Sequence, residues 1–271
     1  MTVAAAINGQ IASEGAALYA MQYAQTLDRT LELLHVKNDQ DALEEVETSM
    51  ENIERAAAER GVEVRRFILE GEPVRAVGNH LLEGRAEILF CGARVRKNLR
   101  KDSFSRRLLA GCSDCDIAVA HTPHAGAVLA VEHALLPIRE DRLSPMKFAF
   151  FATLLRGCGA AGEIYSVTRL RTRRRSELET CQVRERLEQI NRRLSHYTRL
   201  AALAGFSLHV KHAFASDRTA QILHHLHHYG YQLLVLGGRR PSFPFLKWDR
   251  TERLLQVTPI NTILFYTGQE R

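Results

Sequence analysis

The sequence predicts an α/β protein built from two tandem Rossmann-like units, each a doubly wound, five-stranded parallel sheet with strand order 3-2-1-4-5. Short apolar runs rich in β-branched residues alternate with longer segments of helical period, which is the pattern of parallel strands joined by helices. This alternation runs through the chain twice. The length of 271 residues also suits two domains of about 100–200 residues each.

Four pairs of similar segments indicate that the second half of the chain repeats the first. They are residues 32–36 with 163–167, 62–66 with 208–212, 88–94 with 233–239, and 116–120 with 261–265. The offset rises from 131 to 145 or 146 after the first pair, so the second copy carries roughly fourteen extra residues between its second and third strands. The repeat predicts a first domain over residues 1–124 and a second, more basic and more divergent domain over residues 125–271. Residues 121–126 contain Pro and Gly and suit a short linker.

In the first copy, five apolar runs are the predicted strands: about residues 3–8, 31–36, 62–68, 86–91 and 116–120. The segment between the second and third strands places Val46, Met50, Ile53 and Ala57 at spacings of 4, 3 and 4. This spacing forms one apolar stripe on an otherwise polar helix. We therefore expect the stripe to face the sheet.

In the second copy, the predicted strands are about residues 132–138, 162–168, 207–212, 231–236 and 261–266. A long helix between the second and third strands repeats its apolar residues at spacings of 4 and 3. They are Val183, Leu187, Ile190, Leu194, Tyr197 and Ala201. We expect this stripe to be core as well, since every helix that covers a sheet needs such a face.

Composition excludes several classes of protein. No apolar run reaches the ~18–20 residues that a membrane-spanning helix needs, and residues 1–10 lack the basic start and long apolar core of a signal peptide. The five cysteines are an odd number and too few for a disulfide framework. These features predict a cytoplasmic protein with no membrane span.

The net charge of +6 conceals an asymmetry between the halves. Residues 1–124 carry 15 Lys and Arg against 19 Asp and Glu, whereas residues 125–271 carry 22 against 12. The basic half predicts an anionic small molecule or an acidic protein as partner. The alternative is a basic face that keeps the chain soluble or packs on the acidic half. Nucleic acid is disfavoured, because the basic segments lack interleaved aromatic residues on which bases stack.

The first third of the chain carries the most specific pattern. Its first strand ends in Ile7-Asn8-Gly9 and is followed by Ser13, its second strand reads Leu33-Leu34-His35-Val36, and its fourth strand ends in Gly92-Ala93-Arg94. Together with the duplication, these features resemble the universal stress protein family in its tandem form. The resemblance implies stress-response regulation, pairing of the two units through their last strands, and dimers. Many members of that family bind ATP through a Gly-x2-Gly-x9-Gly-Ser/Thr pattern after strand four, so the resemblance also implies a nucleotide site there.

Both copies depart from that nucleotide pattern. In the first copy Gly92 is kept, but Val95 stands at the second glycine and Asp102-Ser103 stands where Gly-Ser is expected. Glycines let backbone N–H groups approach phosphates, and a carboxylate at a helix start would repel them. In the second copy, strand four is followed by Gly237-Gly238-Arg239-Arg240-Pro241-Ser242, and the helix entry reads Trp248-Asp249-Arg250-Thr251. We therefore expect the first copy to bind ATP more weakly than a complete pattern would.

Arginines and lysines replace the missing glycines. They follow the carboxyl ends of predicted parallel strands, where open α/β sheets bind ligands, and they can hold phosphates by charge and paired hydrogen bonds. The candidate residues for a nucleotide or another anion are Asn8, Gly9, Val36, Gly92, Arg94, Arg96, Ser103, Arg173, Arg174, Gly237, Arg239 and Thr251. ATP or another nucleotide is the one cofactor that the pattern suggests. A solvated basic loop that binds nothing is the alternative for the arginine tract at residues 169–175.

Two further patterns are weak. His224 and His228 share a helix face and could ligate a metal, but no third ligand is evident, so an amphipathic helix with exposed imidazoles is the simpler interpretation. Cys112 and Cys115 form a C-x-x-C pair, for which a buried, structural Cys115 is preferred. We assign no metal site to either pattern.

No known catalytic motif occurs in the sequence, so we predict that the chain is not an enzyme and assign no catalytic residue. Two functional hypotheses remain. The first is a stress-response regulatory protein that binds a nucleotide or another anionic ligand at the basic carboxyl edge of its sheets. The second is a scaffold or protein-interaction module that binds no nucleotide. A homodimer is compatible with both.

Overall fold

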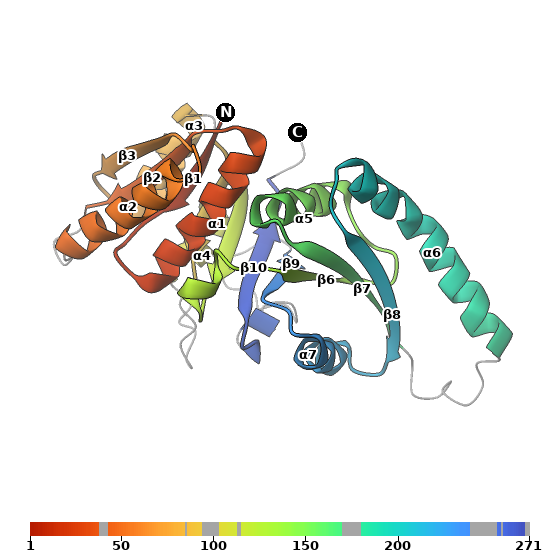
Figure 1. The fold of residues 1–271 in the computed structure, drawn as a ribbon. Coiled ribbons are helices and arrows are strands. Elements are labelled where there is room, and N and C mark those ends of the chain that lie inside the picture. The colour runs from red at the N-terminus through yellow and green to blue at the C-terminus, as the bar shows by residue number, and fades with distance from the viewer. Residues whose placement is uncertain are drawn as a thin grey trace. The chain divides into compact units, whose positions relative to one another are not determined.

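A computed structural model of the chain describes residues 1–37, 43–84, 86–93, 103–112, 115–169, 180–238, 254–255 and 257–268 (Figure 1). Its contacts divide the chain into two compact units. Unit 1 is Met1–Ala130 with Leu236–Arg271, and unit 2 is Val131–Val235. Unit 1 includes the last strand of the chain because that strand pairs with the fifth. The domain boundary predicted between residues 124 and 125 follows the sequence repeat and stays a prediction.

Unit 1 contains a sheet with the strand order β3-β2-β1-β4-β5-β10. Its strands are β1 (Thr2–Ala6), β2 (Leu31–Val36), β3 (Val64–Leu69), β4 (Ala86–Gly92), β5 (Asp116–His121) and β10 (Asn261–Tyr266). Its helices are α1 (Ile11–Leu27), α2 (Leu43–Ala58), α3 (Pro73–Gly84), α4 (Phe104–Gly111) and the short 3₁₀ helix η1 (Ala125–Ala127). The strand pairs are parallel except for β5 with β10, which is antiparallel. Helices α1 and α2 cover one face of this sheet and α3 covers the other (Figure 1).

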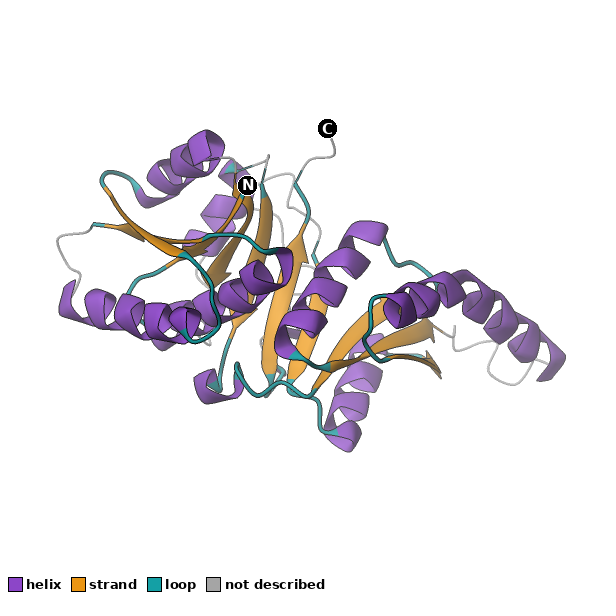
Figure 2. Cartoon of the chain, turned by 45° about the horizontal axis from the view of Figure 1, so that its top comes forward, coloured by secondary structure: helices purple, strands orange, loops and turns teal. Residues whose placement is uncertain are grey.

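Unit 2 contains an all-parallel arrangement of strands in the order β9-β6-β7-β8. The strands are β6 (His133–Arg139), β7 (Ala161–Arg169), β8 (Leu208–Ala215) and β9 (Leu233–Gly237). The helices are α5 (Pro145–Cys158), α6 (Thr180–Leu203) and α7 (Arg218–Tyr229). Helices α5 and α7 lie on opposite faces of these strands (Figures 1 and 2). The last two residues of β9 belong to unit 1, and just beyond them, in the same unit, the N–H of Gly238 donates to the carbonyl of Phe265 in β10 at 2.8 Å.

The predicted fold class is confirmed. Counted from its own first strand, each copy follows the order 3-2-1-4-5, and every predicted strand is present within three residues of its predicted ends. The third strand of the first copy starts at Val64, later than predicted, because the N–H of Val62 still donates to Ala57 at the end of α2. The last strands of the two copies pair with each other, with Leu264 opposite Val119.

Both predicted apolar helix stripes face core. Val46, Met50, Ile53 and Ala57 are buried on α2. On α6 the last four residues of the stripe, from Ile190 to Ala201, are buried, whereas Val183 and Leu187 are only partly covered. This helix has 24 residues against 16 in α2, so it accounts for eight of the roughly fourteen additional residues of the second copy. Among the helices of the described residues, none is long and apolar enough to cross a membrane.

Candidate functional site

The carboxyl edge of unit 1 brings several candidate residues together. Strand β1 pairs with β2 on one side and with β4 on the other, so the three strand ends lie side by side. Asn8 and Gly9 follow β1, Val36 ends β2, and Gly92 ends β4. Ser103 is the N-cap of α4, the helix that follows β4. The structure therefore places these five candidates at the predicted edge of the sheet.

The turn from β1 into α1 uses its own polar groups. The side-chain oxygen of Asn8 accepts from the N–H of Gln10 at 3.3 Å, and the N–H of Asn8 donates to Ser13 Oγ at 3.3 Å. Gly9 has a φ of 72°, and a Cβ there would lie 3.0 Å from the Cβ of Glu45. Asn8 and Gly9 therefore form a tight turn against the start of α2.

Gly92 meets the backbone of α1 at close range. A Cβ on this residue would lie 2.6 Å from both the carbonyl carbon and the oxygen of Ala12, and 2.8 Å from the nitrogen of Ser13. Backbone atoms cannot rotate away as a flexible side chain can. The glycine is therefore required for the packing of β4 against α1, whatever it contributes to a ligand.

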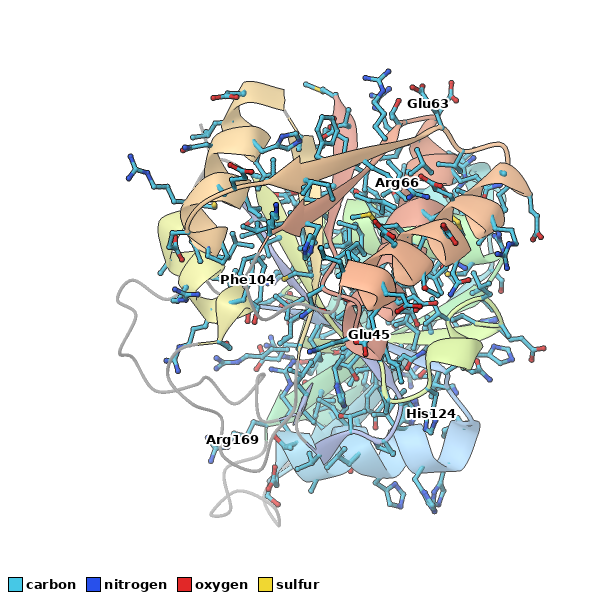
Figure 3. All side chains as sticks on the ribbon, turned by 90° about the vertical axis from the view of Figure 1, so that its left-hand side faces the viewer. Glu45, Glu63, Arg66, Phe104, His124 and Arg169 are labelled. Carbon is cyan, nitrogen blue, oxygen red and sulfur yellow. The ribbon has the colours of Figure 1, made fainter. Side chains whose placement is uncertain are left out.

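Acidic residues occupy the helix starts along the edge of unit 1. Glu14 lies in the first turn of α1, Glu45 lies in the first turn of α2 (Figure 3), and Glu72 precedes α3. Glu72 accepts a backbone hydrogen bond from Arg75 at 2.9 Å, which lowers the pKa of its carboxyl group. A helix N-terminus favours a negative charge, and here the protein's own carboxylates supply it. The described part of this edge is consequently a poor site for phosphate.

Unit 2 carries different charges at the matching positions. With the repeat offset of 131, Arg139 takes the place of Asn8, and Glu140 takes the place of Gly9. Glu140 also has a left-handed backbone, with a φ of 55°. Its carboxylate pairs with Arg186 of α6 at 2.8 Å, and the neighbouring Asp141 pairs with Arg193 of the same helix. The acidic side chains of this loop are thus neutralised.

Two basic residues lie at helix starts of unit 2. Lys147 lies in the first turn of α5, whose N-cap Ser144 accepts from the Lys147 N–H at 3.3 Å. Arg218 is the first residue of α7, after the N-cap Asp217. Partial burial lowers the pKa of Lys147, and the positive charge of Arg218 lowers that pKa further. No carboxylate of the described residues forms an ion pair with Lys147. Two helix starts of this unit therefore carry positive charge.

Sequence patterns did not indicate Lys147 and Arg218, although one signal was available. A basic residue in the first turn of a helix is opposed by the helix dipole, so two such residues in one unit are unusual. The other predicted residues of the second copy are only partly described. Gly237 ends β9, and Arg169 ends β7 (Figure 3). Arg94, Arg96, Arg173, Arg174, Arg239 and Thr251 lie outside the described residues.

A second constellation lies between sheet and helix in each unit. Glu32 of β2 contacts His80 of α3 at 2.9 Å, and Glu163 of β7 contacts His225 of α7 at 2.5 Å. The four residues correspond through the repeat, at offsets of 131 for the glutamates and 145 for the histidines. Each pair joins the second strand of its copy to the helix that follows the third strand. Sequence analysis missed both pairs.

The pair in unit 2 belongs to a larger buried network. Lys211 Nζ lies 2.8 Å from Glu163, and the Tyr231 hydroxyl lies 3.1 Å from His225 Nε2. The His225 ring stacks on Tyr165 with centroids 3.8 Å apart. Burial alone would raise the pKa of Glu163, but hydrogen bonds from His225, Lys211 and Tyr231 lower it below its ordinary value. With only 7% of the Glu163 side chain exposed, this network stabilises the fold and offers no open binding surface.

The structure describes the side chains that define both weak sequence patterns, the cysteines of the C-x-x-C pair and the histidines of α7. Cys115 is buried, as predicted, and Cys112 is partly buried. His224 and His228 are exposed on α7. Among the residues that the structure describes, no group of three His, Cys, Asp or Glu side chains could hold a metal ion.

Comparisons with known proteins bear on the fold. A comparison with protein-family models finds no match, and a comparison with curated proteins finds none. Among solved structures, the chain is similar to a universal stress protein from Archaeoglobus fulgidus DSM 4304, with a TM-score of 0.61, 13% identity and coverage of 96% of each chain. It is also similar to a Pseudomonas aeruginosa UCBPP-PA14 protein assigned to the universal stress proteins, with a TM-score of 0.57, 14% identity, and 98% of this chain and 92% of that one covered.

A third similar structure is the cytoplasmic domain of a prokaryotic cation chloride cotransporter, with a TM-score of 0.55 and 15% identity over 89% of this chain and 86% of that one. At such identities the likeness establishes a shared fold. The protein therefore has the universal stress protein fold, and the alignment over nearly the whole chain shows its two-domain form. The resemblance found in the sequence is confirmed at this level.

Proposed function

We propose that the chain is a regulatory protein of the universal stress protein type, without catalytic activity, that binds a phosphate-bearing small molecule at the carboxyl edge of unit 2. The observation that carries this proposal is that Lys147 and Arg218 lie in the first turns of α5 and α7, where the charge of Arg218 lowers the pKa of Lys147. The helix dipole disfavours a positive charge at a helix start, and a bound anion offsets that cost. An anion at this edge would accept charge-assisted hydrogen bonds from the basic side chains.

The surroundings of the two cations support the same ligand chemistry. Arg139 ends the neighbouring strand β6, and the acidic residues that follow it are already paired with arginines of α6. The carboxyl edge of a parallel sheet is also where this class of fold places ligands. The predicted contacts Arg173, Arg174 and Arg239 belong to segments that leave this edge, and they remain part of the proposal. A nucleotide is the ligand that we propose to test first.

For unit 1 we propose a supporting role. Its helix starts carry glutamates, and its Asn8, Gly9 and Gly92 serve tight packing, so the described edge offers little to an anion. We still expect from the sequence that the first copy binds ATP more weakly than a complete motif would. Its remaining candidate residues are Val36, Ser103, Arg94 and Arg96. Action in the cytoplasm and assembly into a homodimer are further parts of the proposal. A scaffold without any ligand is the alternative, and the acidic edge of unit 1 is the observation that favours it.

The double substitution Lys147→Gln with Arg218→Gln tests the proposal. We expect ATP or inorganic pyrophosphate, titrated calorimetrically into the full chain, to bind the variant at least about tenfold more weakly, because one hydrogen bond to a charged group contributes about 1.5–3 kcal/mol. Binding to the wild type should also weaken as salt is raised. Arg156→Gln is the matched control, because Arg156 is exposed in the last turn of the same helix.

Three results would count against this function. Equal affinity of the double variant and the wild type would remove the site from the carboxyl edge of unit 2. An equal loss of affinity in Arg156→Gln would show that the effect comes from the net charge of the protein and not from a site. No binding of either probe by the wild type, at low or high salt, would favour the scaffold. The variant Arg173→Glu with Arg174→Glu, titrated alongside, tests the arginine tract separately.

A further inference from the structure

Helix α7 exposes three imidazole side chains near its carboxyl end, those of His224, His227 and His228. The rings of His224 and His228 lie one helical turn apart, with centroids 4.2 Å from each other and planes inclined by 34°. The ring of His227 is farther from that of His228, at 6.0 Å. None of the three forms a hydrogen bond or ion pair with a described residue. Two imidazoles are therefore held side by side with their nitrogens unused by the protein.

The helix that carries these rings is firmly placed. Asp217 caps its start by accepting from the N–H groups of Thr219 and Ala220 at 2.9 and 3.3 Å. Gly230 ends it in the left-handed conformation, with a φ of 63°. On the covered side, Ile222 and Leu226 are buried against the sheet. The spacing of His224 and His228 is consequently fixed by the fold before any ligand arrives.

We propose that His224 and His228 form a chelating site for one divalent transition metal ion, such as Zn²⁺, Ni²⁺ or Cu²⁺. Neutral imidazole is a preferred ligand for these ions, and residues at i and i+4 on a helix can reach the same ion. Two protein ligands leave positions for water, so the site is open and exchangeable, in keeping with the absence of a three-residue metal cluster among the described residues. This inference does not depend on the proposed anion site.

The internal repeat shows that the pair is a feature of unit 2 alone. At the offset of 145, His225 corresponds to His80, and the exposed His224 and His228 correspond to Asn79 and Glu83 of α3. Asn79 and Glu83 are exposed as well. The two helices thus share a histidine that contacts a glutamate of the second strand, and they differ at the two positions that would bind the metal. This gives a matched site for a gain-of-function test.

The experiment is a calorimetric titration of the full chain with ZnCl₂ and, separately, NiCl₂. Wild-type protein should bind one more equivalent of metal than the variant His224→Gln with His228→Gln, because other histidines and cysteines contribute equally to both. The single variant His228→Gln should lose at least about tenfold in affinity, since loss of even an outer partner of a metal ligand costs about 10- to 100-fold. His227→Gln, on the same helix, should keep the site. Binding should weaken on acidification, because protonated imidazole does not ligate metal.

The gain-of-function arm adds Asn79→His and Glu83→His to the double variant. If spacing on a capped, packed helix is sufficient, the lost equivalent of metal should return. An unchanged number of equivalents in the double variant would overturn the proposal, and so would an equal loss in His227→Gln. Failure of the graft, with circular dichroism showing an intact fold, would overturn the argument from helical spacing.

Discussion

Replacing Glu163 with glutamine should destabilise the protein by about 3 kcal/mol, the lower end of the cost of breaking a buried ion pair. The carboxylate accepts from His225 and from Lys211, and its hydrogen bonds extend to Tyr231. Glutamine keeps one acceptor oxygen but places an N–H₂ group opposite a donor. Neither Lys211 nor His225 has an ion pair with another carboxylate of the described residues. Urea denaturation followed by circular dichroism measures the loss.

The matched control is Glu32→Gln in unit 1. Glu32 is as buried as Glu163, but its one ion pair with a described residue is that with His80, whose side chain is 15% exposed. We expect a smaller loss, about 1–2 kcal/mol, which is the cost of one charged hydrogen bond with a partly accessible partner. Equal losses at the two glutamates would show that Lys211 and Tyr231 contribute nothing to the network.

The pH dependence follows from the direction of the Glu163 pKa. Because the folded-state pKa is lowered, the contribution of this carboxylate is fully present above the unfolded-state pKa of glutamate, about 4.3. It is lost as the pH falls through the lower folded-state pKa. The difference in unfolding free energy between wild type and Glu163→Gln should therefore be constant near neutral pH and shrink in acid. A difference that grew on acidification would contradict the assigned ionic state.

The sequence predicted the fold well because its signals were local. Alternation of apolar runs placed every strand within a few residues, and the stripe from Val46 to Ala57 needed only helical spacing to be assigned to core. The grouping of β10 with unit 1 was not predictable in this way, because the antiparallel register of β5 with β10 joins residues about 145 positions apart. The repeat indicated that the two strands are equivalent, and the family resemblance implied that the last strands of the two units pair.

The candidate site was predicted less completely, for the same reason. Strand ends marked the carboxyl edge, so Asn8, Gly9, Val36 and Gly92 were placed correctly along it. Pairs such as Glu163 with His225, or Lys147 with Arg218, combine residues from separate helices and strands, and each member alone has the pattern of an ordinary amphipathic segment. The family motif also assigned Gly92 to phosphate binding. The motif carries no information on the backbone of α1, which lies beside Gly92 in the structure.

Gly92→Ala should therefore destabilise the protein by about 3 kcal/mol, at the upper end of the usual cost of overpacking. The added methyl would lie 2.6 Å from the backbone of Ala12, so either β4 or the start of α1 must move. Gly126→Ala is the control, because a Cβ at Gly126 meets no atom within 4 Å and its φ is not in the left-handed region. Both substitutions restrict the unfolded chain equally, by about 0.4–1 kcal/mol in favour of folding. The difference between the two variants in urea denaturation thus isolates the steric clash.

A third variant separates backbone from side-chain contact. Ala12→Gly combined with Gly92→Ala should not restore stability, because the atoms in the way are the carbonyl group of Ala12 and the nitrogen of Ser13. Rescue by Ala12→Gly would contradict that assignment. If Gly92→Ala kept wild-type stability and lost only the binding of ATP or pyrophosphate, Gly92 would instead be a ligand residue, and unit 1 would have to be included in the anion site.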